Sequence, residues 1–309
     1  MKNKNLILMS IALMGIFLVT ACKKDDNTAA PVATTDQTVA EYAISDPNFS
    51  ILVQALTKAG LVDVLNGAGN FTVFAPTNAA FNALFAQLGV SGIADLSAET
   101  LTPILLYHVL GTEKKASMIT SGYYASLSPA QGNFASMEIS VSGGVFIDKD
   151  AKVTTADVDV KNGVIHVIDK VLLPPSVVDL ALDNSDFSIL VQAVVKANLV
   201  ETLSSAGPFT IFAPTNTAFE ALFTTLGITG IADLTAEQLT PILLYHVVSG
   251  NVRSADLSDG SVETLNGPIE ISLSPSPTIN GTTNIVATDV QGTNGVVHVI
   301  DKVLLPAAK

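Results

Sequence analysis

Phe71-Thr-Val-Phe-Ala-Pro-Thr-Asn78 is the stretch that decides the fold, because it occurs twice. It returns 138 positions later as Phe209-Thr-Ile-Phe-Ala-Pro-Thr-Asn216, and the flanking segments 48–110 and 186–248 align without a gap. Each copy is a short apolar run of β-forming residues that a proline stops, followed by a threonine and an asparagine that can cap a helix. The sequence therefore predicts a strand followed by a helix at the same place in two copies of one unit.

Two further blocks repeat in the same order. Pro103-Ile-Leu-Leu-Tyr-His108 returns as Pro241-Ile-Leu-Leu-Tyr-His246, and Asn162-Gly-Val-Ile-His-Val-Ile-Asp169 returns as Asn294-Gly-Val-Val-His-Val-Ile-Asp301. A period of this length corresponds to a whole domain, because solenoid repeats are much shorter. We therefore expect each copy to fold around its own hydrophobic core.

Within each copy, the first part has the pattern of helices. Apolar residues recur at helical spacing in 51–59 and 189–197, and Asn48 is placed to cap the first of these helices. Another helix is expected from Ser97, and Pro103 should break or restart it.

The second part of each copy has the pattern of strands. From about Leu110, short alternating runs are separated by Gly, Ser, Asp and Asn turns, and Val164–Ile168 is apolar except at its histidine. Helices followed by strands predict an α+β unit, with helices packed over a mainly antiparallel sheet or sandwich. We place the first domain at 38–175 and the second at 176–309.

The N-terminus has the pattern of an export signal. Lys2 and Lys4 precede the apolar stretch 6–19, which as a helix would extend about 21 Å, short of the roughly 30 Å hydrocarbon core of a bilayer. Residues 1–21 are therefore expected to be a cleaved signal peptide. Cys22 follows a valine, a threonine and an alanine, which resembles a bacterial lipobox; the alternative is an ordinary cleavage site beside a chance cysteine.

Cys22 is also the only cysteine, so no disulfide stabilises the fold. A lipid on Cys22 explains why an exported protein keeps a single thiol. Residues 22–37 are polar and are expected to form a lipid-anchored flexible tether. Its two lysines followed by aspartates resemble the surface-export signals of Bacteroidota lipoproteins. We therefore expect an outer-membrane lipoprotein exposed at the cell surface, with periplasm-facing domains as the alternative.

The formal net charge of −13 argues against a nucleic-acid partner. The sequence also contains no phosphate-binding loop, dinucleotide fingerprint or nucleophile elbow. We expect no enzymatic activity, no cofactor and no bound metal.

All four histidines lie in the repeated blocks, two in each domain: His108, His166, His246 and His298. A metal site or a catalytic base is one interpretation, but structural metals need three or four ligands. The nearest carboxylates, Asp169 and Asp301, are three residues further along a strand and so face the other side. We expect buried histidines that hydrogen-bond to backbone or side chains.

The repeated blocks resemble the fasciclin domain family. Phe71–Asn78 matches that family's first signature, the pairs Tyr107-His108 and Tyr245-His246 match its central motif, and Asn162–Asp169 matches its second signature. The resemblance covers nearly everything after residue 38. It implies a seven-stranded β-wedge with a helical layer, and adhesion or extracellular binding in place of catalysis. In some animal members the tyrosine–histidine motif is proposed to contact integrins; here we expect core packing, with direct recognition as the alternative.

The segment 111–150 is the candidate contact region of the first domain. Tyr123 and Tyr124 are possible ligand contacts there, and the alternative is that they complete the core. The leading functional hypothesis is a cell-surface adhesion protein that recognises extracellular matrix, glycan or protein ligands through two fasciclin-like domains. The alternative is a structural spacer or assembly protein that contacts other envelope proteins.

Overall fold

The computed structural model of the chain describes residues 36–307. The predicted signal peptide 1–21, the lipid on Cys22 and nearly all of the tether 22–37 lie outside the described residues. Within 36–307, no helix has both the length and the apolar character that a membrane span requires. The described residues belong to one compact unit.

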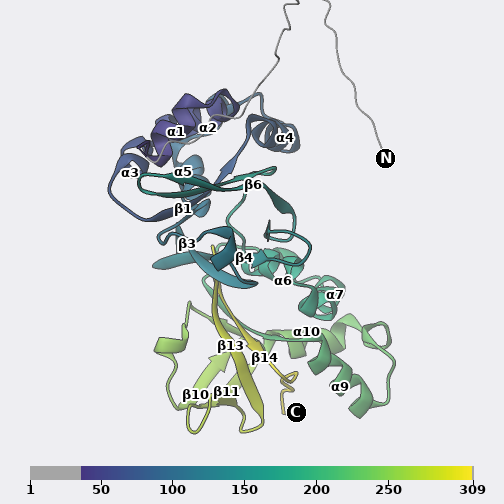
Figure 1. The fold of residues 1–309 in the computed structure, drawn as a ribbon. Coiled ribbons are helices and arrows are strands. Elements are labelled where there is room, and N and C mark those ends of the chain that lie inside the picture. The colour runs from purple at the N-terminus through teal and green to yellow at the C-terminus, as the bar shows by residue number, and fades with distance from the viewer. Residues whose placement is uncertain (1–35, 308–309) are drawn as a thin grey trace, which may run out of the picture. The chain divides into compact units, whose positions relative to one another are not determined.

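The first domain opens with helices that lie together on one side of β1 (Figure 1). The helices are α1 (Val39–Ser45), α2 (Ser50–Ala59), α3 (Val62–Asn66), α4 (Asn78–Leu88) and α5 (Ala98–Tyr107). The strands are β1 (Phe71–Pro76), β2 (Val109–Leu110), β3 (Gly122–Ala130), β4 (Asn133–Ser140), β5 (Phe146–Ile147), β6 (Ala151–Val160) and β7 (Gly163–Ile168).

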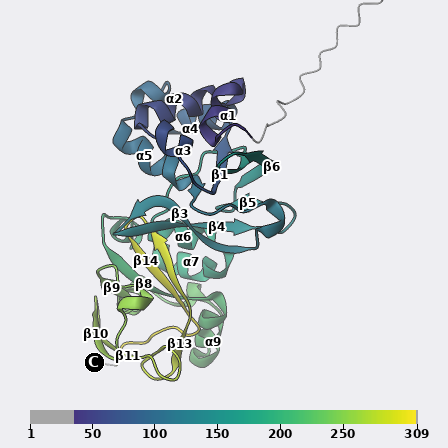
Figure 2. The same ribbon diagram turned by 60° about the vertical axis from the view of Figure 1, so that its left-hand side comes forward.

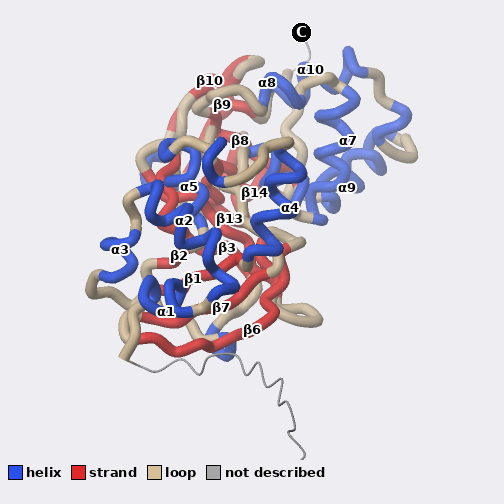
Figure 3. The backbone as a smooth tube through the Cα atoms, turned by 90° about the horizontal axis from the view of Figure 1, so that it is seen from above, coloured by secondary structure: helices blue, strands red, loops and turns tan. Residues whose placement is uncertain are grey.

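The second domain repeats this series. Its helices are α6 (Val177–Asp183), α7 (Ser188–Lys196), α8 (Val200–Leu203), α9 (Asn216–Leu226) and α10 (Ala236–Leu244). Its strands are β8 (Phe209–Pro214), β9 (Val247–Ser249), β10 (Gly260–Thr264), β11 (Gly267–Ser272), β12 (Thr278–Ile279), β13 (Thr283–Gly292) and β14 (Gly295–Ile300). The helices α7 and α9 lie side by side (Figure 3), and β13 and β14 form a long antiparallel pair (Figure 2).

Both domains have the same seven-stranded sheet. The strand order is β2-β1-β7-β6-β5-β4-β3 in the first domain, and the second domain has the equivalent order β9-β8-β14-β13-β12-β11-β10. Only β1 with β7 and β8 with β14 pair in parallel within the described residues. The α+β class with a mainly antiparallel sheet and a helical layer is therefore confirmed.

Each sheet separates two hydrophobic clusters, because successive side chains of a strand face opposite sides. Val73 and Ala75 of β1 pack in the cluster under the helices, whereas Phe74 packs in the cluster on the other face with Tyr107. The second domain divides its core in the same way, with Phe212 and Tyr245 in the far cluster. Each copy thus has its own interior.

Two local predictions about helices are wrong. Pro103 does not break its helix: α5 runs through it from Ala98 to Tyr107, because the carbonyl that loses a partner belongs to exposed Glu99 and can bond to water. Asn48 is not a helix cap. It lies in a 3-10 turn, where the Asp46 side chain accepts its backbone N–H at 2.9 Å, and α2 begins only at Ser50.

Candidate functional site

The tyrosine–histidine pair of the first domain joins the end of α5 to the chain that follows β7. His108 Nδ1 lies 2.7 Å from the Ile104 carbonyl oxygen, and the backbone N–H of Leu172 donates to Nε2 at 2.9 Å. Because Nε2 accepts a hydrogen bond, the ring proton must be on Nδ1 and the imidazole must be neutral. Burial favours this state and lowers the pKa of His108 to about 4.

The second domain repeats this geometry. His246 Nδ1 lies 2.8 Å from the Ile242 carbonyl oxygen, and the N–H of Leu304 donates to Nε2 at 2.9 Å. Burial again lowers the histidine pKa to about 4. The neighbouring tyrosines fix the far cluster: Tyr107 Oη donates to the Ser136 carbonyl oxygen at 3.0 Å, and Tyr245 Oη donates to that of Pro268 at 2.9 Å.

The histidines of the second signature carry their ring proton on the other nitrogen, Nε2. His166 Nδ1 accepts the N–H of Asp157 at 3.2 Å, and its Nε2 lies 2.9 Å from the Lys114 carbonyl oxygen. Its ring stacks on Phe74 with 5.5 Å between centroids. His298 has the same arrangement in the second domain, where burial lowers its pKa.

The Asn-Gly pair that opens the second signature anchors three segments. Asn162 Oδ1 accepts the N–H of Val39 at 2.9 Å, and Nδ2 donates to the carbonyl oxygens of Leu65 and Gly67, each at 2.8 Å. Gly163 has φ of +149°, and a Cβ there would collide with the Phe71 carbonyl. This Asn-Gly pair therefore serves the fold, because its groups are fully used inside it.

The first signature is also engaged internally. Thr77 Oγ1 accepts the N–H of Ala80 at 3.3 Å as the cap of α4. Asn78 Oδ1 accepts the N–H of Ile51 at 2.9 Å, and its Nδ2 donates to the Pro47 carbonyl oxygen at 2.9 Å. These polar side chains connect α4 to the start of α2.

None of the four histidines has a ring nitrogen free to bind a metal or to take a proton from a substrate. Both nitrogens of each ring are bonded to backbone groups. Among residues 36–307, no group of three or more His, Cys, Asp or Glu side chains is arranged to hold a metal ion.

The structure places Tyr123 and Tyr124 in partly buried positions. Tyr123 Oη accepts a hydrogen bond from Asn184 Nδ2 at 3.0 Å, and burial raises the pKa of Tyr123 to about 12. Tyr124 Oη donates to the Thr120 carbonyl oxygen at 2.9 Å, and the Lys114 ammonium lies 5.4 Å from its ring centroid. Both hydroxyls are thus already bonded within the chain.

Other side chains of 111–150 face the solvent. Met118 is 56 % exposed and Phe134 is 51 % exposed, whereas Met137 is fully buried. Exposed side chains of this size are suited to contacting a ligand. The hydrophobic pattern of the sequence did not show that Met118 and Phe134 are exposed while Met137 is buried.

Asp148 is a partly buried acid that the sequence analysis did not single out. Its Oδ1 accepts the N–H of Glu138 at 3.0 Å, while its buried Oδ2 has no hydrogen-bond partner. Burial raises the pKa of Asp148 to about 7, and the negative charges of Asp183 and Glu138 add to this effect. Asn280 occupies the same position in the second domain. Comparing the two copies in the sequence could therefore have drawn attention to Asp148, because an acid replaces an amide there.

Acidification is expected to destabilise the second domain through His246. Its pKa of about 4 in the fold lies below the ordinary 6.5, so the unfolded chain binds the proton more tightly. The stability that neutral His246 contributes is present above pH 6.5 and is lost as pH falls to 4, by up to about 3 kcal/mol. Urea unfolding of the full chain and of His246→Gln across this range measures the effect. The prediction is contradicted if the free energy of unfolding changes with pH in the same way in the two proteins.

The comparisons with known proteins agree with these features. The fasciclin domain family matches residues 47–174 and 185–306. Protein sll1483 of Synechocystis sp. is 40% identical over 132 residues, which cover 42% of this chain and 73% of that protein. Uncharacterized protein sll1735 of the same organism is 42% identical over 133 residues, which cover 42% of this chain and 98% of that protein.

Two further matches cover most of this chain. Human periostin is 31% identical over 255 residues, which cover 80% of this chain but only 29% of periostin. The solved FAS1 domain pair of the insect cell adhesion molecule fasciclin I is 19% identical, with a TM-score of 0.46 and coverage of 82% of this chain and 95% of that chain. The matches to the family extend over most of both halves, and the chain therefore belongs to the fasciclin domain family, with two domains in tandem.

Proposed function

We propose that this chain is a non-enzymatic adhesion protein, which recognises extracellular matrix, polysaccharide or protein ligands through its two fasciclin domains. A lipid on Cys22 anchors it to the outer membrane, with the domains facing outward. The observation that carries this proposal is that the signature side chains form hydrogen bonds inside their own domains. Because His108, His246 and Asn162 are bonded to backbone groups, contact with a ligand falls to the surfaces in which the two copies differ.

Membership in the family supports an adhesive role, since fasciclin domains occur in cell adhesion proteins. The absence of free histidine nitrogens in the described residues is also more typical of a binding domain than of an enzyme. Two similar domains on one chain can bind a repetitive ligand twice, which raises its apparent affinity when the geometry allows.

The location is tested by protease treatment of intact cells. We expect both domains to be cleaved from intact cells, and a Cys22→Ala variant to leave the membrane fraction. A periplasmic marker protein serves as the control for envelope integrity. Protection of the domains until the outer membrane is opened would favour the envelope spacer.

The contact surface of the first domain is tested by replacing its exposed apolar residues with those at the equivalent positions of the second domain. Asp256 and Asn266 occupy the positions that correspond to Met118 and Phe134. We expect Met118→Asp with Phe134→Asn to reduce binding to immobilised extracellular polysaccharide at least tenfold, because the exposed apolar contacts are lost. The matched control exchanges exposed Leu88 for Asp. Equal binding by the parent and the double variant would remove these residues from the contact surface.

A further inference from the structure

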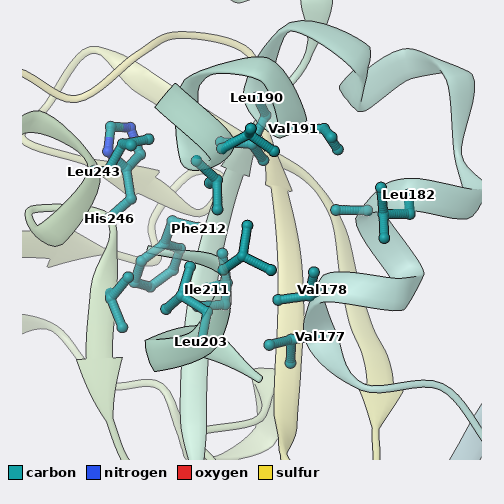
Figure 4. Close-up of a pocket in the computed structure, with 15 residues that line it drawn as sticks. Val177, Val178, Leu182, Leu190, Val191, Leu203, Ile211, Phe212, Leu243 and His246 are labelled. Atoms are coloured by element: carbon teal, nitrogen blue, oxygen red, sulfur yellow. The ribbon is translucent and has the colours of Figure 1, made fainter. Parts of the chain in front are cut away.

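The second domain contains an apolar cavity that is almost closed in the first. Its volume is about 150 Å³, and it lies between α6, α7, α8, α10 and β8. The side chains of Val178, Leu190 and Ile211 surround it from three of these elements (Figure 4). At the same place in the first domain, the space has a volume of about 20 Å³. The fold itself therefore does not require the cavity.

Two substitutions between the copies reduce the side-chain volume beside the cavity. Tyr42 and Leu56 line the small space in the first domain, and the second domain has Leu180 and Val194 at these positions. Both changes remove side-chain volume, and Leu180 does not reach the cavity lining as Tyr42 does. Protein interiors are normally close-packed, so a void of this size is a specific feature of the second domain.

The helices that border the cavity are also tied together differently. In the first domain, Thr38 Oγ1 donates to Asn66 Oδ1 at 2.6 Å and links the start of α1 to the end of α3. Ser204 replaces Asn66 in the second domain, and the Ser176 hydroxyl instead donates to Asp179 Oδ2 at 2.7 Å. The side-chain link that joins α1 to α3 in the first domain thus has no equivalent between Ser176 and Ser204 in the second. The Ser176 hydroxyl is used within the cap of α6 instead.

Apolar side chains at the cavity reach the solvent. Leu182, Val195 and Val200 line it and are 49%, 56% and 38% exposed. A molecule can therefore enter from the surface without unfolding of the domain.

The lining selects for uncharged, apolar ligands. Its single polar side chain is His246, and both ring nitrogens of His246 are bonded to backbone groups. A buried water needs two to four polar partners, which this lining does not offer. Cavities of about 150 Å³ with such walls stay dry and accept benzene-sized molecules.

We propose that the second domain binds a small hydrocarbon group in this cavity, a ring or a branched chain of about six to eight heavy atoms. The group belongs to a free small molecule or forms the end of a larger one whose polar part stays at the mouth, beside Leu182 and Val195. This site is separate from the adhesive surfaces proposed above and does not depend on them.

The experiment titrates the full chain with toluene and, separately, with 1-hexanol, while methyl resonances are followed by NMR. We expect saturable shifts for methyl groups of Val178, Leu190 and Val191, and none for Leu52 and Val53 of the first domain. A response to toluene identifies a ring-sized ligand, and a response to 1-hexanol identifies a chain end with a polar head. No saturable shift with either probe overturns the proposal.

Exchanging residues between the copies provides the matched variants. Leu180→Tyr with Val194→Leu should fill the cavity and weaken binding of the responding probe at least tenfold. The reverse exchange, Tyr42→Leu with Leu56→Val, should create binding in the first domain and thus keeps the test valid if the filled variant does not fold. Unchanged affinity in the filled variant, or a reverse variant without new binding, contradicts the proposal.

Discussion

Asn162→Asp is expected to lower the free energy of unfolding of the first domain by about 4 kcal/mol. The substitution keeps the shape of the side chain but replaces an amide nitrogen with an oxygen. That nitrogen donates to the carbonyl oxygens of Leu65 and Gly67, so an aspartate would place negative charge against two acceptors in the interior. Only the bond from the Val39 N–H would remain favourable.

Urea unfolding, with hydrogen exchange to assign the loss to the first domain, measures this effect. Asn82→Asp on the exposed face of α4 is the matched control, because it adds the same charge at the surface. Asn294→Asp should produce an equal loss in the second domain, since Asn294 makes the equivalent bonds to Val177, Leu203 and Ser205. A loss no greater than that of the control would refute the anchoring role.

Asp148→Asn is expected to stabilise the first domain by about 2 kcal/mol at pH 8. At this pH the carboxyl is ionised, although its buried Oδ2 has no partner and the acids Asp183 and Glu138 are nearby. The second domain shows the alternative: Asn280 Oδ1 accepts the N–H of Glu270 at 2.9 Å, and its Nδ2 donates to Tyr245 Oη at 3.2 Å. An asparagine at 148 can use Tyr107 in the same way.

The gain should depend on pH in a defined direction. The pKa of Asp148 is about 7 in the fold and 3.8 as the ordinary value, so between these pH values the folded state holds the proton more tightly. The stability that the neutral acid contributes is present below pH 4 and is lost as pH rises through 7. The expected gain of about 2 kcal/mol is smaller than the full pKa shift would give, because Asp148 is partly exposed and solvent screens its charge.

Unfolding measured between pH 4 and pH 8 tests this prediction. The advantage of Asp148→Asn should grow with pH, and Asn280→Asp should transfer the same dependence to the second domain. The parent's first domain should respond weakly to acid, because His108 and Asp148 oppose each other between pH 4 and 6.5. A constant difference between parent and variant at every pH would show that burial does not shift this carboxyl.

The sequence was sufficient to predict the class of the fold and the strand-then-helix order at Phe71–Asn78, because hydrophobic period and turn residues are local signals. The continuity of α5 through Pro103 was not predictable, because it depends on the surroundings of Glu99, the exposed residue whose carbonyl loses its helical partner. The hydrogen-bond partners of His108, such as Leu172, lie far along the chain and become visible only in three dimensions.

The candidate sites were harder to predict than the fold. Tyr123 and Tyr124 are aromatic and lie between small and polar residues, which is why they are possible ligand contacts. The sequence did not show that their hydroxyls bond within the chain, and their contact with a ligand stays a prediction. The cavity of the second domain is accompanied by a loss of side-chain volume at Leu180 and Val194, and a single copy carries no sign of it. Only comparison of the two copies position by position reveals such differences.

The parallel pairing of β1 with β7 has a consequence for how the protein is made. Strand β1 lies near the beginning of its domain and β7 at the end, and without β7 the only neighbour of β1 in its sheet is the two-residue strand β2. Contacts that join distant parts of a chain form late and slowly. A nascent chain that stops before Gly163 therefore lacks the strand that joins β1 to β6 and the rest of the sheet, so each domain matures as a whole or is left open to proteases.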